Sequence, residues 1–181
     1  MLSAQCTDKM VNIVTEKLFK KHKKIEDYAN VDIDQLEQDI RSTGFYRNKA
    51  KHIKAAAQLI LEKFNGEVPR TMAELITLPG VARKTANIVL GNAYNIVEGV
   101  AVDTHVFRLS RRLGFSDSNN TDRVEKDLMR ILPKKDWFRL TYLLIEHGRA
   151  ICKAPLPRCD SCFLNKICPS AFNFPNFQRV K

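Results

Sequence analysis

Two side chains in the middle of the chain have the types needed for covalent chemistry on a sugar: Lys84 and Asp103. A lysine amine becomes a nucleophile when partial burial and neighbouring cations, such as the adjacent Arg83, lower its pKa and leave it neutral. An amine together with a carboxylate can attack a sugar carbon and form a Schiff base. Taken singly, the two residues also fit a solvated lysine and a plain helix cap, so the prediction depends on their combination.

A tight hairpin and a helix are the elements that would position the lysine. Leu78 precedes a proline and is pushed out of helical geometry, while Gly80 accepts a positive φ, so residues 79–82 are predicted to form the hairpin. The helix over 82–93 would place Lys84 opposite a stripe of apolar residues, which is expected to face the core. The members of this stripe are Ala82, Ala86, Val89 and Ala93.

The aspartate is predicted to cap a second helix. Asp103 precedes Val106 and Leu109, which have helical spacing, and Gly114 ends the run. Backbone N–H groups at such a position hold a carboxylate in its ionised form.

The hairpin itself is suited to bind phosphate. The backbone N–H groups of Gly80 and Ala82 would lie beside the positive end of the following helix dipole. Phosphate contacts fix register without reading bases, so we expect Lys84 to be delivered to nucleic acid of any sequence.

Composition favours a nucleic-acid partner and excludes a membrane protein. The formal charge is +10, 28% of the residues are charged, and no apolar run approaches the roughly 18 residues of a membrane span. Four of the five cysteines fall between Cys152 and Cys168. That arrangement disfavours a secreted disulfide framework and predicts a reducing, intracellular compartment.

The fold class is predicted to be all-α, because no segment alternates with a period of two long enough for a sheet. A long helix is expected after Gly44, ending at Gly66. Three further helices are expected, capped by Thr7 or Asp8, by Asp32 or Asp34, and by Thr71. Another is expected to be capped by Thr121, with Val124, Leu128 and Ile131 facing inward. A last one is expected to start at Asp136, with Leu140, Leu143 and Leu144 facing inward.

The start of the long helix carries four cations and no acidic residue, which predicts a phosphate track made of Arg47, Lys49, Lys51 and Lys54. Phe45 and Tyr46 lie at the preceding turn, where an aromatic side chain could wedge between bases; packing into the core is at least as good an interpretation of Tyr46.

The four clustered cysteines predict a metal centre. They have the spacing C-x6-C-x2-C-x5-C, formed by Cys152, Cys159, Cys162 and Cys168. Zinc sites usually show two C-x2-C pairs and this stretch has one, so the spacing leans toward an iron–sulfur cluster and leaves zinc open. Within the same loop, Lys153 and Arg158 could contact phosphate.

The sequence LPGVARKTA, followed by VDTH and the four cysteines, resembles the endonuclease III family of helix-hairpin-helix DNA glycosylases. The resemblance implies that Lys84 is the catalytic lysine, that Asp103 is the catalytic aspartate and that the four cysteines hold a 4Fe-4S cluster. It also implies that Gln5 and Phe45 occupy the gap left by an extruded base, although the residues alone favour a buried polar role for Gln5. One departure is Ala82, where the family commonly has a second glycine.

The family resemblance implies two helical domains, 1–97 ending in the hairpin helix and 98–181 holding the cluster, with double-stranded DNA in the groove between them. It implies a monomeric, cytoplasmic, nucleoid-associated DNA glycosylase and AP lyase that removes oxidised pyrimidines and cuts abasic sites by β-elimination. The resemblance also implies that an N-terminal segment of the family is lacking. The alternatives are a monofunctional mismatch or adenine glycosylase and a non-catalytic, cluster-bearing DNA-binding protein.

Overall fold

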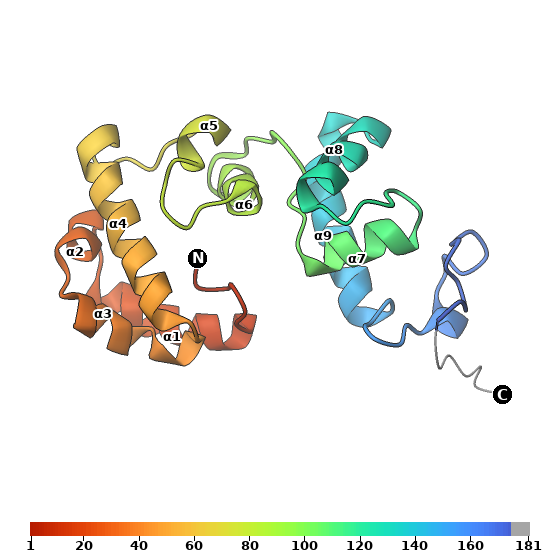
Figure 1. Ribbon diagram of the computed structural model, residues 1–181, viewed down its shortest axis with the longest axis horizontal. Helices are drawn as coiled ribbons and strands as arrows, with labels where there is room; N and C mark the ends of the chain where they lie inside the picture. Colours follow the sequence, from red (N-terminus) through yellow and green to blue (C-terminus); the bar gives the residue numbers. More distant parts are fainter. Residues whose placement is uncertain (175–181) are drawn as a thin grey trace. The chain divides into compact units, whose positions relative to one another are not determined.

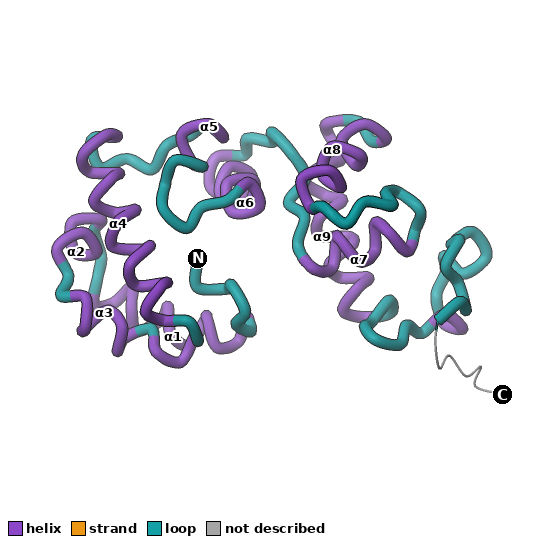
Figure 2. The backbone as a smooth tube through the Cα atoms, in the orientation of Figure 1, coloured by secondary structure: helices purple, strands orange, loops and turns teal. Residues whose placement is uncertain are grey.

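The computed structural model describes residues 1–174, and every regular element there is a helix (Figures 1 and 2). The all-α prediction is confirmed. None of these helices is long and apolar enough to cross a membrane. In chain order the elements are α1 (Asp8–Lys21), α2 (Ile25–Asn30), α3 (Ile33–Asp39), the 3-10 helix η1 (Arg41–Thr43), α4 (Tyr46–Phe64), α5 (Met72–Leu75), α6 (Arg83–Tyr94), α7 (Thr104–Arg112), α8 (Thr121–Ile131), α9 (Lys134–Ala150) and the 3-10 helix η2 (Cys159–Ser161).

The backbone forms two compact units that divide within α6: Met1–Ala86, and a second unit that begins at Asn87. The predicted domain boundary at Val97 is a statement about folding and function. The division by backbone contacts does not test it, so it stays a prediction.

The first unit is built around α1, α3 and α4. Its core contains Val14, Leu18, Val31, Leu36, Ile40 and Ala50. The predicted caps are present: Thr7 Oγ1 accepts a hydrogen bond from Met10 N at 3.4 Å, and Asp32 Oδ1 accepts from Gln35 N at 3.0 Å. These bonds satisfy N–H groups that have no partner inside the helix and so set where each helix begins.

The second unit is built around α7, α8 and α9. Its core contains Val100, Val102, Val106, Leu109, Val124, Leu128 and Leu144. Two predictions about α8 are wrong. Asn120 is the cap, accepting from Arg123 N at 3.0 Å, while Thr121 is the first helical residue. Ile131, predicted to face inward, is 47% exposed.

The start of α9 also differs from expectation. The helix begins at Lys134, directly after Pro133 and before Asp136. The ring of proline fixes φ near −65°, and the residue has no N–H to satisfy, so the chain can turn into a helix there. The buried face of α9 is narrower than predicted, because Leu144 is buried but Leu143 is 54% exposed.

Candidate active site and cysteine loop

The predicted hairpin is present between α5 and α6. Gly80 has a φ of +73°, and Val81 N donates to Leu78 O at 3.1 Å. A Cβ on Gly80 would lie 2.9 Å from the Cβ of His52 on α4, so close packing and backbone conformation both require glycine. Sequence reasoning missed His52, because nothing in the local pattern links α4 to the hairpin.

Lys84 lies in the first turn of α6, directly after this hairpin, and its side chain is exposed. The predicted stripe on α6 is partly wrong. Ala86 is fully buried, but Ala82 and Ala93 are exposed, and the buried face also contains Asn87, Leu90 and Gly91. The helix starts at Arg83, so Ala82 lies outside it, and the buried pair Ala86 and Leu90 has the i, i+4 spacing of one helix face.

Asp103 caps α7, as predicted. Its Oδ1 accepts a hydrogen bond from Val106 N at 2.8 Å, and the side chain is half-buried. The residues that precede it, Val100, Ala101 and Val102, are all buried. The carboxylate is therefore fixed at the positive end of the α7 dipole, where an ionised acid is favoured.

Lys84 belongs to the first unit and Asp103 to the second. Lys84 is exposed and not partly buried as expected, Asp103 is fixed by its hydrogen bond to Val106 N, and the meeting of the two side chains stays a prediction.

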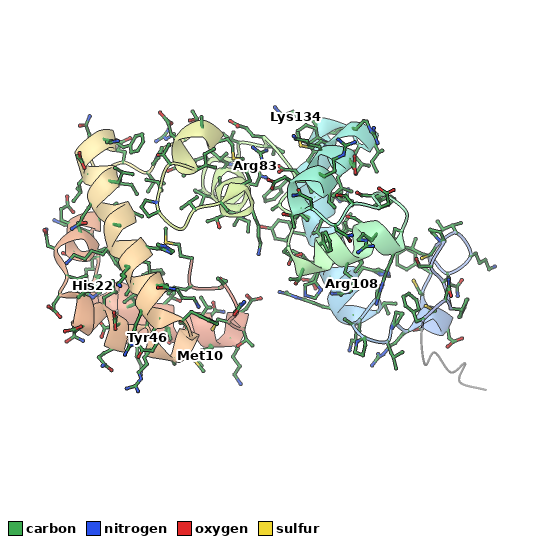
Figure 3. All side chains as sticks on the ribbon, in the orientation of Figure 1. Met10, His22, Tyr46, Arg83, Arg108 and Lys134 are labelled. Carbon is green, nitrogen blue, oxygen red and sulfur yellow. The ribbon has the colours of Figure 1, made fainter. Side chains whose placement is uncertain are left out.

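Three side chains of the first unit that were predicted to contact DNA are exposed. Gln5 and Phe45 both have positive φ angles, 52° and 48°, and Phe45 is 66% exposed. The interpretation of Gln5 as a buried polar helix residue is wrong, because it lies in the turn before α1. Arg47 is exposed, with Nε 3.8 Å from Glu37 Oε2. Tyr46 packs partly against the core of the first unit (Figure 3).

Lys49 does not belong to a surface phosphate track, which corrects the sequence prediction. The residue is 6% exposed, and its Nζ donates to Thr43 O at 2.8 Å and to Leu2 O at 2.9 Å. Burial lowers the pKa of its ammonium group. Lys54 is also turned inward, donating to Val31 O at 2.8 Å. Both ammonium groups therefore bond to backbone carbonyl oxygens of neighbouring segments of the first unit.

The four cysteines of the loop after α9 line one cavity of the second unit, together with Arg112, His147 and other side chains. Cys159 is buried and the other three are half-buried. Burial raises the pKa of the Cys162 thiol; a backbone hydrogen bond at Leu164 opposes this rise, and the charges of Cys152, Cys159 and Cys168 add to it.

Two arginines of α7 hold the cysteine loop, and sequence reasoning assigned them no such role. Arg108 (Figure 3) donates from Nη2 to Cys152 O at 3.0 Å and to Gly148 O at 3.3 Å. Arg112 donates from Nη1 to Lys153 O at 2.9 Å and to Cys152 Sγ at 3.3 Å. The side chain of Lys153 itself is exposed, as its predicted DNA contact requires.

The hairpin has a counterpart among known families. A family model described as "HhH-GPD superfamily base excision DNA repair protein" matches residues 1–134. The fold and the hairpin therefore define the class: a base excision DNA repair protein of this superfamily.

Individual relatives narrow the class. Endonuclease III of Synechocystis sp. (strain ATCC 27184 / PCC 6803 / Kazusa) is 52% identical over 94% of this chain and 78% of its own length. Endonuclease III of Bacillus subtilis (strain 168) is 52% identical over 92% of this chain and 76% of its own. The chain belongs to the endonuclease III family, and endonuclease III is a DNA glycosylase and AP lyase of base excision repair.

Solved structures agree with this assignment. A trapped covalent intermediate of endonuclease III with DNA matches with a TM-score of 0.90 and 50% identity, covering 94% of this chain and 80% of that one. A thermostable thymine-DNA glycosylase matches with a TM-score of 0.81 and 25% identity, covering 93% and 79%.

Proposed function

We propose that this chain excises oxidised pyrimidines from double-stranded DNA and cleaves the strand at the resulting abasic site. One observation carries the proposal: an exposed lysine, Lys84, stands in the first turn of α6 behind the positive-φ hairpin, in a chain 50% identical to an endonuclease III that was trapped in a covalent intermediate with DNA.

The chemistry follows from an amine and an ionised acid. The neutral Nζ of Lys84 attacks the anomeric carbon of an extruded nucleotide, the glycosidic bond breaks, and the base leaves with its electron pair and takes up a proton. The carboxylate of Asp103, held at the start of α7, stabilises the cationic sugar as it forms. The ring opens to a Schiff base with Lys84. Loss of a C2′ proton then expels the 3′ phosphate and cuts the strand.

Extrusion of the nucleotide requires side chains that fill the vacated space. Phe45 and Gln5 are suited to this role because both are exposed and stand at tight turns with positive φ. Gly80 and Ala82 would bind phosphate through their N–H groups, and Arg47 and Lys153 would contact the backbone from exposed positions.

Borohydride trapping on duplex DNA with an abasic site tests the proposal. We expect a covalent adduct with the unchanged protein, no adduct with Lys84→Ala, and a normal adduct with Lys63→Ala, a matched exposed lysine in the last turn of α4. An adduct that survives Lys84→Ala would contradict the role of Lys84.

Borohydride trapping separates the lyase from two rivals, and base release from duplex DNA that still carries the damaged base separates the rivals from each other. A monofunctional glycosylase would release bases without any trapped adduct, and likeness to a thymine-DNA glycosylase at 25% identity makes this the nearer rival. A non-catalytic binding protein would neither release bases nor be trapped. The presence of Lys84 favours the lyase over both.

We also propose that Cys152, Cys159, Cys162 and Cys168 hold a 4Fe-4S cluster. They line a single cavity, and their spacing contains one C-x2-C pair where zinc sites usually have two, which favours the cluster over zinc. Bound there, the cluster would supply a positively charged cross-link that keeps the thiols ionised and folds the loop.

Metal analysis of the purified protein tests this assignment. We expect iron and acid-labile sulfide in equal amounts, with a broad visible absorption that disappears when Cys159 is replaced by serine. A colourless protein loaded with zinc would contradict it. The five cysteines are all free of disulfides, which supports a reducing compartment, and we propose that the protein acts on DNA in the cytoplasm.

A further inference from the structure

Three elements of the second unit converge on one buried carboxylate, that of Glu125 on α8. The residue is 3% exposed. From α6, Asn87 donates a hydrogen bond from Nδ2 to Glu125 Oε1 at 2.8 Å. From the segment before α7, Gly99 approaches so closely that a Cβ added there would overlap the same oxygen. The carboxylate therefore lies between α6 and residue 99 and touches both.

Both of these neighbours lead directly to residues of the proposed chemistry. Asn87 follows Lys84 by three positions on the same continuous helix, so it lies about one helical turn from the lysine. Gly99 precedes Asp103 by four positions, and the three residues between them are 1% to 7% exposed. Glu125 therefore contacts one residue that follows Lys84 and one that precedes Asp103.

The contact is directional in a way that simple core packing is not. Asn87 is 6% exposed, and its Oδ1 has no hydrogen-bond partner within the described part of the chain. The single bond from Nδ2 to Glu125 is then what orients the amide. An apolar residue of similar size could fill the space at lower desolvation cost but could not fix the two segments in register.

We propose that Glu125 is a positioning residue, which holds α6 from Asn87 onward against the segment that ends in Asp103 and so sets the geometry of the covalent step. This rests on the proposed function. By this proposal α8 affects the rate of Schiff-base formation, although it carries no residue of the proposed chemistry.

Three variants of the whole protein test this role, with two measurements on each well below the unfolding temperature. Glu125→Ala removes the acceptor, Glu125→Gln keeps an acceptor oxygen of the same reach, and Leu128→Ala weakens the same helix at a fully buried position one turn away. The first measurement is the single-turnover rate of borohydride-trapped adduct on abasic DNA. The second is the dissociation constant for duplex DNA carrying a tetrahydrofuran abasic analogue, which cannot form a Schiff base.

We expect Glu125→Ala to lose about 10- to 100-fold in single-turnover rate, since a displacement of about 1 Å can have an effect of that size, with little change in the dissociation constant. Glu125→Gln should recover most of the rate, and Leu128→Ala should lower the unfolding temperature while keeping the rate. If Glu125→Ala does not fold, Asn87→Ala removes the same bond from the other side and should show the same loss.

The proposal is overturned if Glu125→Ala or Asn87→Ala reacts at the normal rate, or if Leu128→Ala loses as much rate as they do. Failure of the proposed function has a different signature, because the unchanged protein itself would then yield no adduct; in that case the role of Glu125 in this step falls with it.

Discussion

Two cation-rich helices, α4 in the first unit and α7 in the second, place their charges in different ways. On α4, Lys49 and Lys54 each direct a single ammonium group at carbonyl oxygens inside the unit. On α7, Arg108 and Arg112 each extend a planar fork that reaches several successive groups at the end of α9 and the start of the cysteine loop. A lysine donates from a single nitrogen, whereas the planar guanidinium of an arginine donates from several nitrogens in a fixed geometry.

The difference shows what net charge can and cannot indicate. A charge of +10 predicts an anionic partner, but Lys49, Lys54, Arg108 and Arg112 on these two helices donate hydrogen bonds to the protein itself. Arg47 and Lys51 on α4 and Arg111 on α7 are exposed, although Arg47 also lies 3.8 Å from Glu37 Oε2. Net charge therefore does not show which residues would touch an anionic partner.

The largest expected effect is on Lys49. Lys49→Met keeps the volume but leaves the carbonyl groups of Leu2 and Thr43 without their donor, so we expect a loss of about 3 kcal/mol in the free energy of unfolding, measured in urea. Lys51→Met, two positions away and exposed, should change it by less than about 0.5 kcal/mol. A small loss for Lys49→Met would mean that its bonds to these carbonyls contribute little.

The next effect tests the arginine fork. Arg112→Lys keeps the charge and removes the planar geometry that reaches Lys153 O and Cys152 Sγ, and we expect a loss of about 2 kcal/mol in the free energy of unfolding. The adjacent Arg111 is exposed, so Arg111→Lys is the matched control and should be nearly neutral. Equal losses in the two variants would show that charge, and not the fork, matters on α7.

Sequence reasoning succeeded where a local rule fixes the conformation. A proline and a glycine specify the hairpin, side-chain oxygens before Met10, Gln35 and Val106 specify three caps, and the spacing of the cysteines specifies a shared cavity. It failed where the answer depends on which face of a helix another segment covers. Nothing local says that Lys49 points at Leu2 or that His52 supports Gly80, because these pairs are brought together only by the fold.

A third prediction concerns a cation that pairs with a carboxylate instead of a carbonyl. Burial by itself would raise the pKa of the Asp39 carboxyl group, but hydrogen bonds from Lys21 and His22 outweigh it and lower that pKa. A lowered carboxyl pKa stabilises the fold at pH values above the unfolded pKa of about 3.9, and the contribution disappears as the pH falls through the folded value. We expect the free energy of unfolding of Asp39→Asn to fall less steeply as the pH is lowered, with a difference of less than about 1 kcal/mol because the pair is partly exposed. The same pH dependence in Asp39→Asn and the unchanged protein would contradict this.

The smallest effect on stability should accompany a clear effect on DNA binding, at the exposed cations. Lys51 is exposed on α4, so Lys51→Ala should leave the free energy of unfolding within about 0.5 kcal/mol. If it contacts a phosphate, it should also reduce the slope of log affinity against log salt by about 0.9, since each neutralised phosphate releases condensed counterions. Lys49→Met should leave that slope unchanged, because the ammonium group of Lys49 is already bonded to carbonyl oxygens inside the first unit.

Fluorescence anisotropy titrations with duplex DNA at several salt concentrations measure both slopes. If instead the Lys49 variant lowers the slope and the Lys51 variant does not, the division of α4 into inward and DNA-facing cations is wrong.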